Sequence, residues 1–248
     1  MTKTKKRYSF VYVILGVMFL LVLWTIAQRA INNDLVIPDI PSVLIALVSL
    51  LKQAKTYSLV FKTIGRLVLT ICACAGLTLV LSYLSYKLDW FENFIKPLFV
   101  LMRTIPVVSL IIFLLFLLGR EISPYFITGF VVLPVMYEGA LSGFWAIDSA
   151  IKDEIKLFSK VNFKVVFFVF IPVTLPYLIA AFIQSFGLGL KVMVMAEFIA
   201  QPKGTIGYAM LQDRAYLNMA NIFAWTIIML VIVFLVEILV KTIRKKYI

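Results

Sequence analysis

Six apolar runs, each long enough to cross a lipid bilayer, constrain the fold of this chain more than any other feature. A helix needs about 20 consecutive apolar residues to cross the hydrocarbon core of a bilayer. Hydrophobic residues make up 63% of the 248 residues, whereas soluble domains are about half apolar. The sequence therefore predicts an all-α, polytopic membrane protein in which residues 1–248 form a single transmembrane domain. We expect six transmembrane helices, at about residues 8–28, 60–86, 97–119, 122–146, 165–195 and 216–240.

The first apolar run is preceded by basic residues, as the core of a signal peptide is. It is longer than the usual signal core, however, and Gln28–Arg29 follow it where a cleavage site would have small residues. We therefore expect a retained first span. The apolar stretch Ile40–Leu51 is too short to cross a bilayer, so we expect it to form a short helix at the membrane interface.

The distribution of lysine and arginine predicts the orientation of the spans. If both termini lie inside, the inner segments carry 15 basic residues and the outer segments carry 8. The cytoplasmic loops of membrane proteins carry the excess of basic residues. We therefore expect both termini in the cytoplasm.

Several function classes are excluded by residue types and their spacing. The chain contains no histidine, which removes the commonest general base and the commonest zinc ligand. Cys72 and Cys74 are two residues apart, so on a helix they point away from each other and form neither a disulfide nor a metal clamp. The net charge of +12 is spread over the ends of apolar runs, which argues against nucleic-acid binding. The spans hold no nucleophile with its base, so we expect no catalytic site and no metal site.

A loop that contains both apolar and charged residues separates the fourth and fifth runs. We expect a helix at about residues 149–162 within this loop. Ile151, Ile155 and Phe158 would lie on one face of this helix. A separate stripe, at steps of four residues, consists of Lys152, Lys156, Lys160 and Lys164. An amphipathic helix of this kind can lie on anionic lipid or insert its apolar ridge into a groove of a cytosolic partner. The spacing alone favours membrane lipid and leaves the protein partner open.

The same loop resembles the cytoplasmic signature of the membrane subunits of type I, binding-protein-dependent ABC importers. That signature is an acidic residue, two alanines, three further residues and a glycine, before an apolar stretch that ends in Leu-Pro. Counted back from Leu175–Pro176, the acidic residue is Asp153 and the glycine position is Ser159. Glu154–Ile155 stand in place of the two alanines, and Gly143–Asp148 match the family's upstream pattern of Gly, four residues and Asp.

Three further stretches resemble the branch of this family that serves nitrate, sulfonates, taurine and some vitamin precursors. They are Arg103–Pro106, the glycine-rich segment Gly187–Glu197 and the loop Gly204–Tyr208. The resemblance covers about residues 35–245. Each motif alone is weak, but their order and spacing are specific to the family.

The resemblance implies the permease subunit of an ATP-driven importer in a bacterial inner membrane, and not an enzyme. In such an importer two membrane subunits form the pore, a dimer of separate ATPase subunits drives it, and an extracytoplasmic binding protein delivers the substrate. One chain with one coupling loop requires a second copy of itself or a related subunit, and of these we favour a homodimer. The sequence contains no G-x-x-x-x-G-K-[ST] loop, so we expect no cofactor on this chain, with ATP and Mg²⁺ bound by the partner ATPase.

The resemblance also assigns roles to two sets of residues. The set that would couple to the ATPase is Asp148, Asp153, Glu154, Ile155, Phe158 and Ser159. The set that would line or gate the translocation path is Arg103, Pro106, Gly187, Gly189, Lys191 and Glu197. The positive charges of Arg103 and Lys191 would suit an anion such as a sulfonate. The resemblance implies a sulfonate, taurine, nitrate or a vitamin precursor as the substrate.

Charged residues within the spans leave alternatives open. Arg103 and Glu138 lie near the inner ends of their spans, so they either reach the cytoplasmic surface or face the path. We expect Glu237 to face Lys241 one helical turn away. The alternative function is an ion-coupled secondary carrier, which would require carboxylates at the membrane centre. The acidic residues of this chain cluster near span ends, which disfavours that reading.

Overall fold

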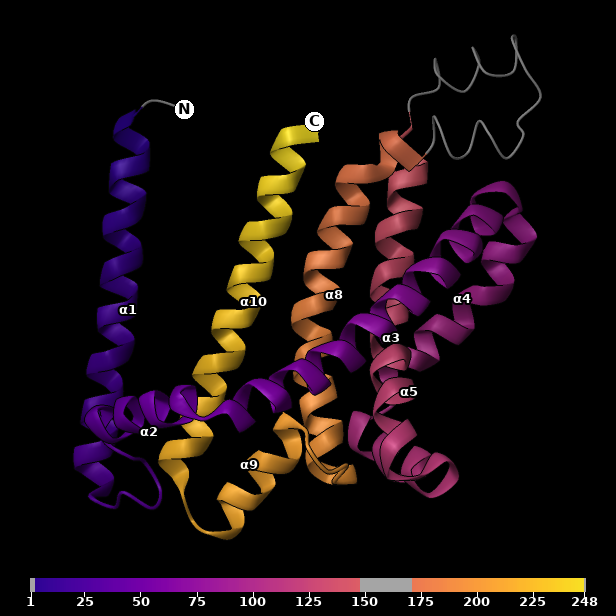
Figure 1. The fold of residues 1–248 in the computed structure, drawn as a ribbon. Helices are drawn as coiled ribbons and strands as arrows, with labels where there is room; N and C mark the ends of the chain where they lie inside the picture. The colour runs from indigo at the N-terminus through magenta and orange to yellow at the C-terminus, as the bar shows by residue number, and fades with distance from the viewer. Residues whose placement is uncertain (1–2, 148–170, 248) are drawn as a thin grey trace. The chain divides into compact units, whose positions relative to one another are not determined.

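The computed structural model describes residues 3–147 and 171–247. Every element in this part of the chain is an α-helix, in agreement with the expected all-α class (Figure 1). In chain order the helices are α1 (Lys3–Ile31), α2 (Ile40–Lys52), α3 (Ala54–Lys87), α4 (Asp89–Thr104), α5 (Val107–Trp145), α8 (Ile171–Ala200), α9 (Ile206–Ala215) and α10 (Met219–Tyr247). The expected helix at 149–162 lies outside the described residues, and so do all six residues assigned to ATPase coupling: Asp148, Asp153, Glu154, Ile155, Phe158 and Ser159.

Five helices of the described part are long and apolar enough to cross a membrane. Their apolar lengths are Tyr12–Ile31, Ala54–Lys87, Val107–Trp145, Thr174–Ala200 and Met219–Thr242. The apolar helix α2 is shorter, at 13 residues, as the sequence predicted. Asp39 caps α2 by accepting a hydrogen bond from the Ser42 amide at 3.2 Å, and Pro41 occupies the first turn, where no amide donor is needed.

The difference from the six expected spans arises at the third, residues 97–119, which is not one continuous helix. Helix α4 ends at Thr104, the backbone is extended at Ile105 (ψ 126°) and Pro106 (ψ 124°), and α5 begins at Val107. Proline has no amide hydrogen, and its ring disfavours a helical conformation of the residue before it. The break therefore falls where Pro106 requires it, inside the expected span.

A second break lies within α5, at Gly119. This residue has φ 75° and ψ 179°, a conformation that only glycine adopts readily. The expected third span ends and the fourth begins near this position, so the break coincides with the predicted boundary. Because of it, the 39 residues of α5 are two helical segments that meet at Gly119.

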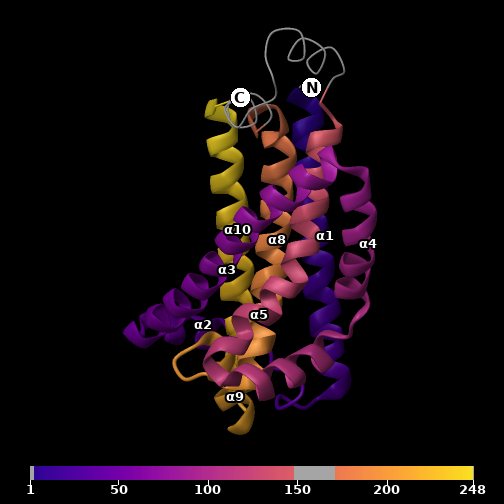
Figure 2. The ribbon, with the colours of Figure 1, turned by 90° about the vertical axis from the view of Figure 1, so that its right-hand side faces the viewer.

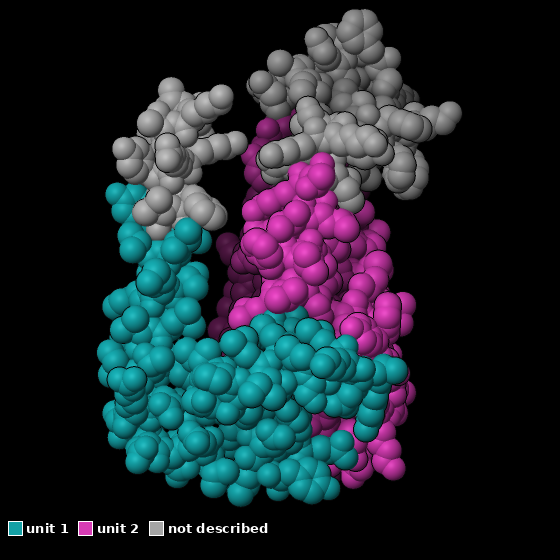
Figure 3. Space-filling model, turned by 60° about the vertical axis from the view of Figure 1, so that its left-hand side comes forward, with its two compact units in different colours: residues 1–56, 210–228 teal, residues 57–209, 229–248 magenta. Residues whose placement is uncertain are grey.

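The chain divides into two compact units, residues 1–56 with 210–228 and residues 57–209 with 229–248 (Figure 3). In the first unit Trp24 of α1 packs against Phe223 of α10, with ring centroids 4.8 Å apart. Its indole nitrogen also donates a hydrogen bond to the Pro38 carbonyl oxygen at 2.9 Å. Further along, Asp213 of α9 accepts a hydrogen bond from the indole nitrogen of Trp225 at 3.0 Å. These indole contacts fix the ends of α1, α9 and α10 within the unit.

In the second unit α5 and α8 run side by side (Figures 1 and 2). Their close approach depends on small residues, because a Cβ atom added to Gly139 would lie 2.4 Å from the Cβ of Ala181. At Gly143, one turn later, an added Cβ would lie 3.0 Å from the Cβ of Thr174. Gly139 and Gly143 thus form a Gly-x-x-x-Gly face of the kind that lets membrane helices pack closely.

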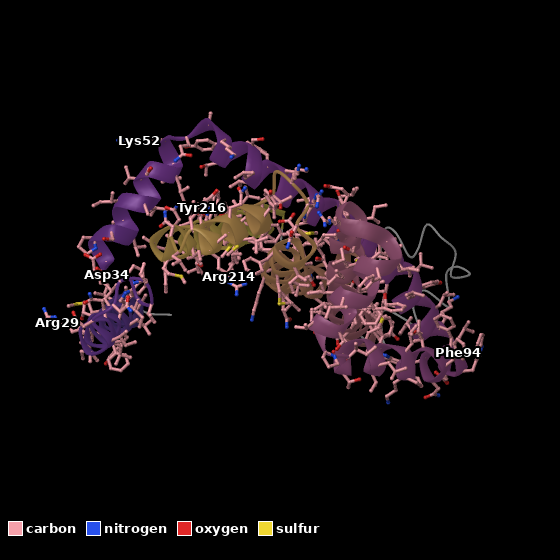
Figure 4. The ribbon with its side chains drawn as sticks, turned by 90° about the horizontal axis from the view of Figure 1, so that it is seen from below. Arg29, Asp34, Lys52, Phe94, Arg214 and Tyr216 are labelled. Atoms are coloured by element: carbon pink, nitrogen blue, oxygen red, sulfur yellow. The ribbon has the colours of Figure 1, made fainter. Side chains whose placement is uncertain are left out.

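Helix α4 packs on the other side of α5. The rings of Phe99 and Tyr137 stack with centroids 4.1 Å apart, and the Tyr137 hydroxyl donates a hydrogen bond to Ser85 of α3 at 2.8 Å. By contrast, Phe94 of α4 is 74% exposed and lies at the edge of this group of helices (Figure 4). The stacked rings and the hydroxyl hydrogen bond together join α3, α4 and α5.

Candidate functional site

A pocket of about 590 Å³ opens beside the break between α4 and α5. Residues of α4, α5 and α8 line it. They are Met102, Arg103, Ile105, Val107, Val131, Val135, Glu138, Gly139, Ser142, Tyr177, Ala180, Ala181, Gln184 and Leu188. The residues on both sides of Pro106 belong to this lining, so the interrupted helix shapes the pocket wall.

Arg103 and Glu138 form an ion pair within this lining, which we call the open pair. The side chain of Arg103 is 39% exposed and that of Glu138 is 59% exposed, so both remain accessible from the pocket. Arg103 also donates a hydrogen bond to the Pro134 carbonyl oxygen at 3.1 Å. The last turn of α4 is therefore tied to α5 by a charged contact that a solute can reach.

The pocket brings polar side chains to an otherwise apolar surface. Ser142, Tyr177 and Gln184 are exposed members of its lining. Elsewhere on α5 the exposed side chains include Phe113 and Phe116, which suit contact with lipid. Polar side chains within membrane segments face a protein interior or a water-filled cavity, because exposure to hydrocarbon is costly. The polar lining therefore marks a face that needs water or another protein.

A second charged group lies near the end of α8, next to α9. We call it the buried cluster after its three buried members, Thr63, Arg66 and Glu197; its fourth member, Glu121, is 60% exposed. Glu197 is fully buried, and one of its oxygens accepts hydrogen bonds from the Thr63 hydroxyl at 2.9 Å and the Gly207 amide at 3.4 Å. Thr63 in turn accepts a hydrogen bond from the Ile206 amide at 3.0 Å. The start of α9 is thus fastened to both α3 and α8.

Arg66 supplies the positive charge of the buried cluster. It forms an ion pair with Glu121 of α5, and its second nitrogen lies 3.8 Å from the remaining oxygen of Glu197. That nitrogen and that oxygen have no hydrogen-bond partner among the described residues. The guanidinium also lies 5.4 Å from the ring centroid of Tyr125, within the range of a cation–π contact.

The turn between α8 and α9 is shaped by two glycines. Gly204 has φ +78°, which favours glycine, and the nearby Lys203 carbonyl accepts a hydrogen bond from Lys62 of α3 at 2.6 Å. At Gly207 an added Cβ would lie 2.5 Å from backbone atoms of Val194 and Phe198. Gly207 of the loop Gly204–Tyr208, which the sequence singled out, is therefore required for the close contact of α9 with α8.

The residues that the sequence assigned to the path fall in different places. Arg103 lines the pocket and Pro106 forms the break beside it. Gly189 is buried, and an added Cβ would lie 2.9 Å from Leu67 of α3. Lys191 is exposed and is absent from the lining, while Glu197 belongs to the buried cluster. An added Cβ at the remaining residue, Gly187, would make an ordinary contact of 3.6 Å with Val233.

Sequence reasoning missed the partners in both charged groups. Arg66 lies inside α3, and its partners Glu121 and Glu197 are 55 and 131 positions away, so no local spacing reveals them. The pairing of Arg103 with Glu138 joins residues 35 positions apart, which no helical spacing reveals. The pair of Glu237 and Lys241, at a spacing of four, was predicted and is confirmed.

No group of three or more histidine, cysteine, aspartate or glutamate side chains that could hold a metal ion occurs in residues 3–147 and 171–247. The helices, the polar pocket and the break at Pro106 define a multi-pass membrane protein with a polar recess in its helical bundle. Residues 73–248 match the family model described as binding-protein-dependent transport system inner membrane component, and the chain belongs to this family. A search of curated proteins found no match.

Proposed function

We propose that the chain is the permease subunit of an ATP-driven importer and that the face carrying the pocket lines its translocation path. Membership of the transport family supports the class. The observation that carries the assignment of the face is the accessible ion pair of Arg103 and Glu138, at the helix break where the membrane-length helix α5 begins. Interrupted helices place polar groups where a solute crosses the bilayer.

A second copy of the chain completes the path in this proposal. The pocket lies on the surface of the single chain, and polar side chains on membrane-spanning helices need a cover other than lipid. A homodimer would place two such faces opposite each other and enclose a water-filled route. An extracytoplasmic binding protein delivers the solute, and the subunit lies in a bacterial inner membrane with both termini in the cytoplasm.

A dimer of separate ATPase subunits binds ATP and Mg²⁺ and couples through residues 148–162 of this chain. The residues proposed for this coupling are Asp148, Asp153, Glu154, Ile155, Phe158 and Ser159. Support comes from the apolar face that the sequence pattern gives the expected helix and from the absence of a nucleotide-binding loop in the sequence.

The sequence led us to expect a small anion or a vitamin precursor as the substrate. The expectation of an anion rested on the positive charges of Arg103 and Lys191. In the structure Arg103 is paired with Glu138, and Lys191 is not part of the lining. The charge that would attract a simple anion is thus balanced at the pocket.

Purification of the tagged full-length chain from its own membranes, with mass spectrometry of the bound proteins, tests the proposed class. We expect a stoichiometric partner with a G-x-x-x-x-G-K-[ST] loop. Absence of such a partner, even after cross-linking within the membrane, would refute the importer and favour an ion-coupled carrier.

The coupling helix is tested by the double substitution Ile155→Asp and Phe158→Asp. Loss of the apolar face should detach the ATPase while the chain still inserts into the membrane. The matched control is Lys152→Asn with Lys160→Asn, which changes the lysine stripe and should leave ATPase recovery unchanged. Normal ATPase recovery with the aspartate variant, or loss with the asparagine variant alone, contradicts the proposed docking face.

A further inference from the structure

The pocket has a balanced charge. Among its described lining residues the charged ones are Arg103 and Glu138, which neutralise each other. Ser142, Tyr177 and Gln184 add polar groups without charge. The volume of about 590 Å³ lies within the range of small-molecule sites. The site therefore offers one cation and one anion side by side to a small solute.

The opposite charges of Arg103 and Glu138 determine which solute can bind to both side chains at once. A simple anion bound to Arg103 would bring its charge close to Glu138, and like charges repel strongly where water is scarce. A simple cation at Glu138 would meet the same difficulty with Arg103. A molecule that carries an acid and an ammonium group can bridge the pair, so that each side chain keeps an opposite charge.

Two features of the pocket fit such a bridging solute. Both members of the open pair are accessible, in contrast to Arg66 and Glu197 of the buried cluster, which are 5% and 0% exposed. The aromatic ring of Tyr177, 44% exposed in the same lining, offers a face that attracts an ammonium group. We propose that the Arg103–Glu138 pocket binds a small zwitterion, its acid group on Arg103 and its ammonium group on Glu138. The proposal rests on the proposed function, because it takes this face to line the path.

The test uses the full-length chain in lipid nanodiscs and three probes of matched size: 3-aminopropanoate, propanoate and propylammonium. Saturation-transfer NMR with competition measures their affinities, and 5-aminopentanoate with pentanoate repeats the comparison at greater charge separation. We expect a zwitterion to bind at least about tenfold more tightly than its matched anion or propylammonium, because it alone makes two charged contacts. Equal affinity for a zwitterion and its anion, or no binding by any probe, overturns the proposal.

Neutralising Arg103 and Glu138 one at a time tests the two contacts separately, because each variant should come to prefer a different singly charged probe. Glu138→Gln should lose the preference for the zwitterion and gain affinity for propanoate, whereas Arg103→Gln should gain affinity for propylammonium. A gain in each variant also shows that the protein is folded. The control Glu237→Gln removes the carboxylate of the exposed Glu237–Lys241 pair on α10 and should change no affinity. The same shift in both pocket variants, or any shift in the control, contradicts the proposed contacts.

The two levels of inference fail separately. ATPase co-purification, measured on the same wild-type preparation, reports on the proposed function without any probe. A bound ATPase together with a pocket that prefers propanoate overturns the zwitterion alone. Absence of the ATPase overturns the importer whatever the probes do.

Discussion

The open pair and the buried cluster use the same side-chain chemistry at two ends of one helical unit, yet their surroundings differ. Arg103 and Glu138 are 39% and 59% exposed in a pocket, and one of them also contacts a helix carbonyl. In the buried cluster Arg66 and Glu197 are 5% and 0% exposed and contact three helices and a turn. A pair that water and solutes can reach can exchange partners during transport, whereas a pair without access can only hold its helices together.

The buried cluster and the pocket also depend on different glycines. The buried cluster requires Gly207, because the α9 backbone must come within hydrogen-bond distance of Glu197. The pocket wall instead depends on Gly139, a lining residue that lets α5 pack against Ala181 of α8. Close backbone contact at Gly207 thus holds the buried cluster in place. Close backbone contact at Gly139 instead forms a rigid wall of the pocket.

The largest expected effect comes from opening the buried cluster. Glu197→Ala should lower the free energy of unfolding by about 3–5 kcal/mol, because the Thr63 hydroxyl and the Gly207 amide lose their buried acceptor and Arg66 loses the negative charge 3.8 Å away. Titration with a denaturing detergent, followed by circular dichroism, measures the change. The combined Arg66→Met and Glu197→Met variant should regain part of the loss, since no unpaired charge remains buried. An effect of Glu197→Ala no larger than that of Glu237→Ala would show that the cluster is not a structural centre.

The next effect tests the close contact around Glu197. Gly207→Ala should cost about 1–3 kcal/mol, because the new methyl group would meet backbone atoms that cannot move independently. The matched control is Gly76→Ala in α3, where an added Cβ has no neighbour within 4 Å. That substitution should be neutral or should stabilise the helix by up to about 1 kcal/mol. Equal melting temperatures for the two variants would contradict the tight packing of α9 on α8.

A comparable or smaller effect is expected at the break within α5. Gly119→Ala meets no atom within 4 Å, so its cost comes only from the backbone conformation at φ 75°. We expect a loss of about 1–2 kcal/mol, measured as a lower melting temperature of the purified chain. Because asparagine tolerates only part of the positive-φ region, Gly119→Asn should not restore stability. An unchanged melting temperature for both variants would mean that the segments on either side of Gly119 form one regular helix.

The smallest effect on stability is expected at the open pair. Glu138→Gln and Arg103→Gln should each change the free energy of unfolding by less than about 1 kcal/mol, since both side chains are partly exposed. Their uptake of the transported solute into cells should nevertheless fall, because the lining has lost one of its two charges. Large destabilisation with unchanged uptake would reverse the roles that we assign to the two charged groups.

Much of the fold follows from local sequence. The apolar runs predicted the long helices, and the apolar stretch Ile40–Leu51 predicted a short helix, whose cap the structure places at Asp39. The spacing of Glu237 and Lys241 predicted their ion pair, which the structure confirms. The extent of the third span was not predicted correctly, because hydropathy does not register the break at Pro106. Apolar residues continue on both sides of that break and only the backbone geometry interrupts them.

The candidate site was predictable in part. The sequence singled out Arg103, Pro106 and Glu197 as unusual residues within spans, since charge and proline are costly there. It gave no means to separate Arg103 from Glu197, and both were assigned to the path. Their partners lie on other helices, and burial depends on how those helices pack, so neither property has a local signature.

The sequence by itself determined that this chain is a helical membrane protein of the transport family, because span length and motif order are local properties of the chain. The tertiary structure decided which charges meet. It buried Glu197 beside Arg66 and left Arg103 with Glu138 open to a pocket, through contacts between helices far apart in the chain. A charge in a membrane protein acquires its role from its partners and its access to water, and both are set by helix packing.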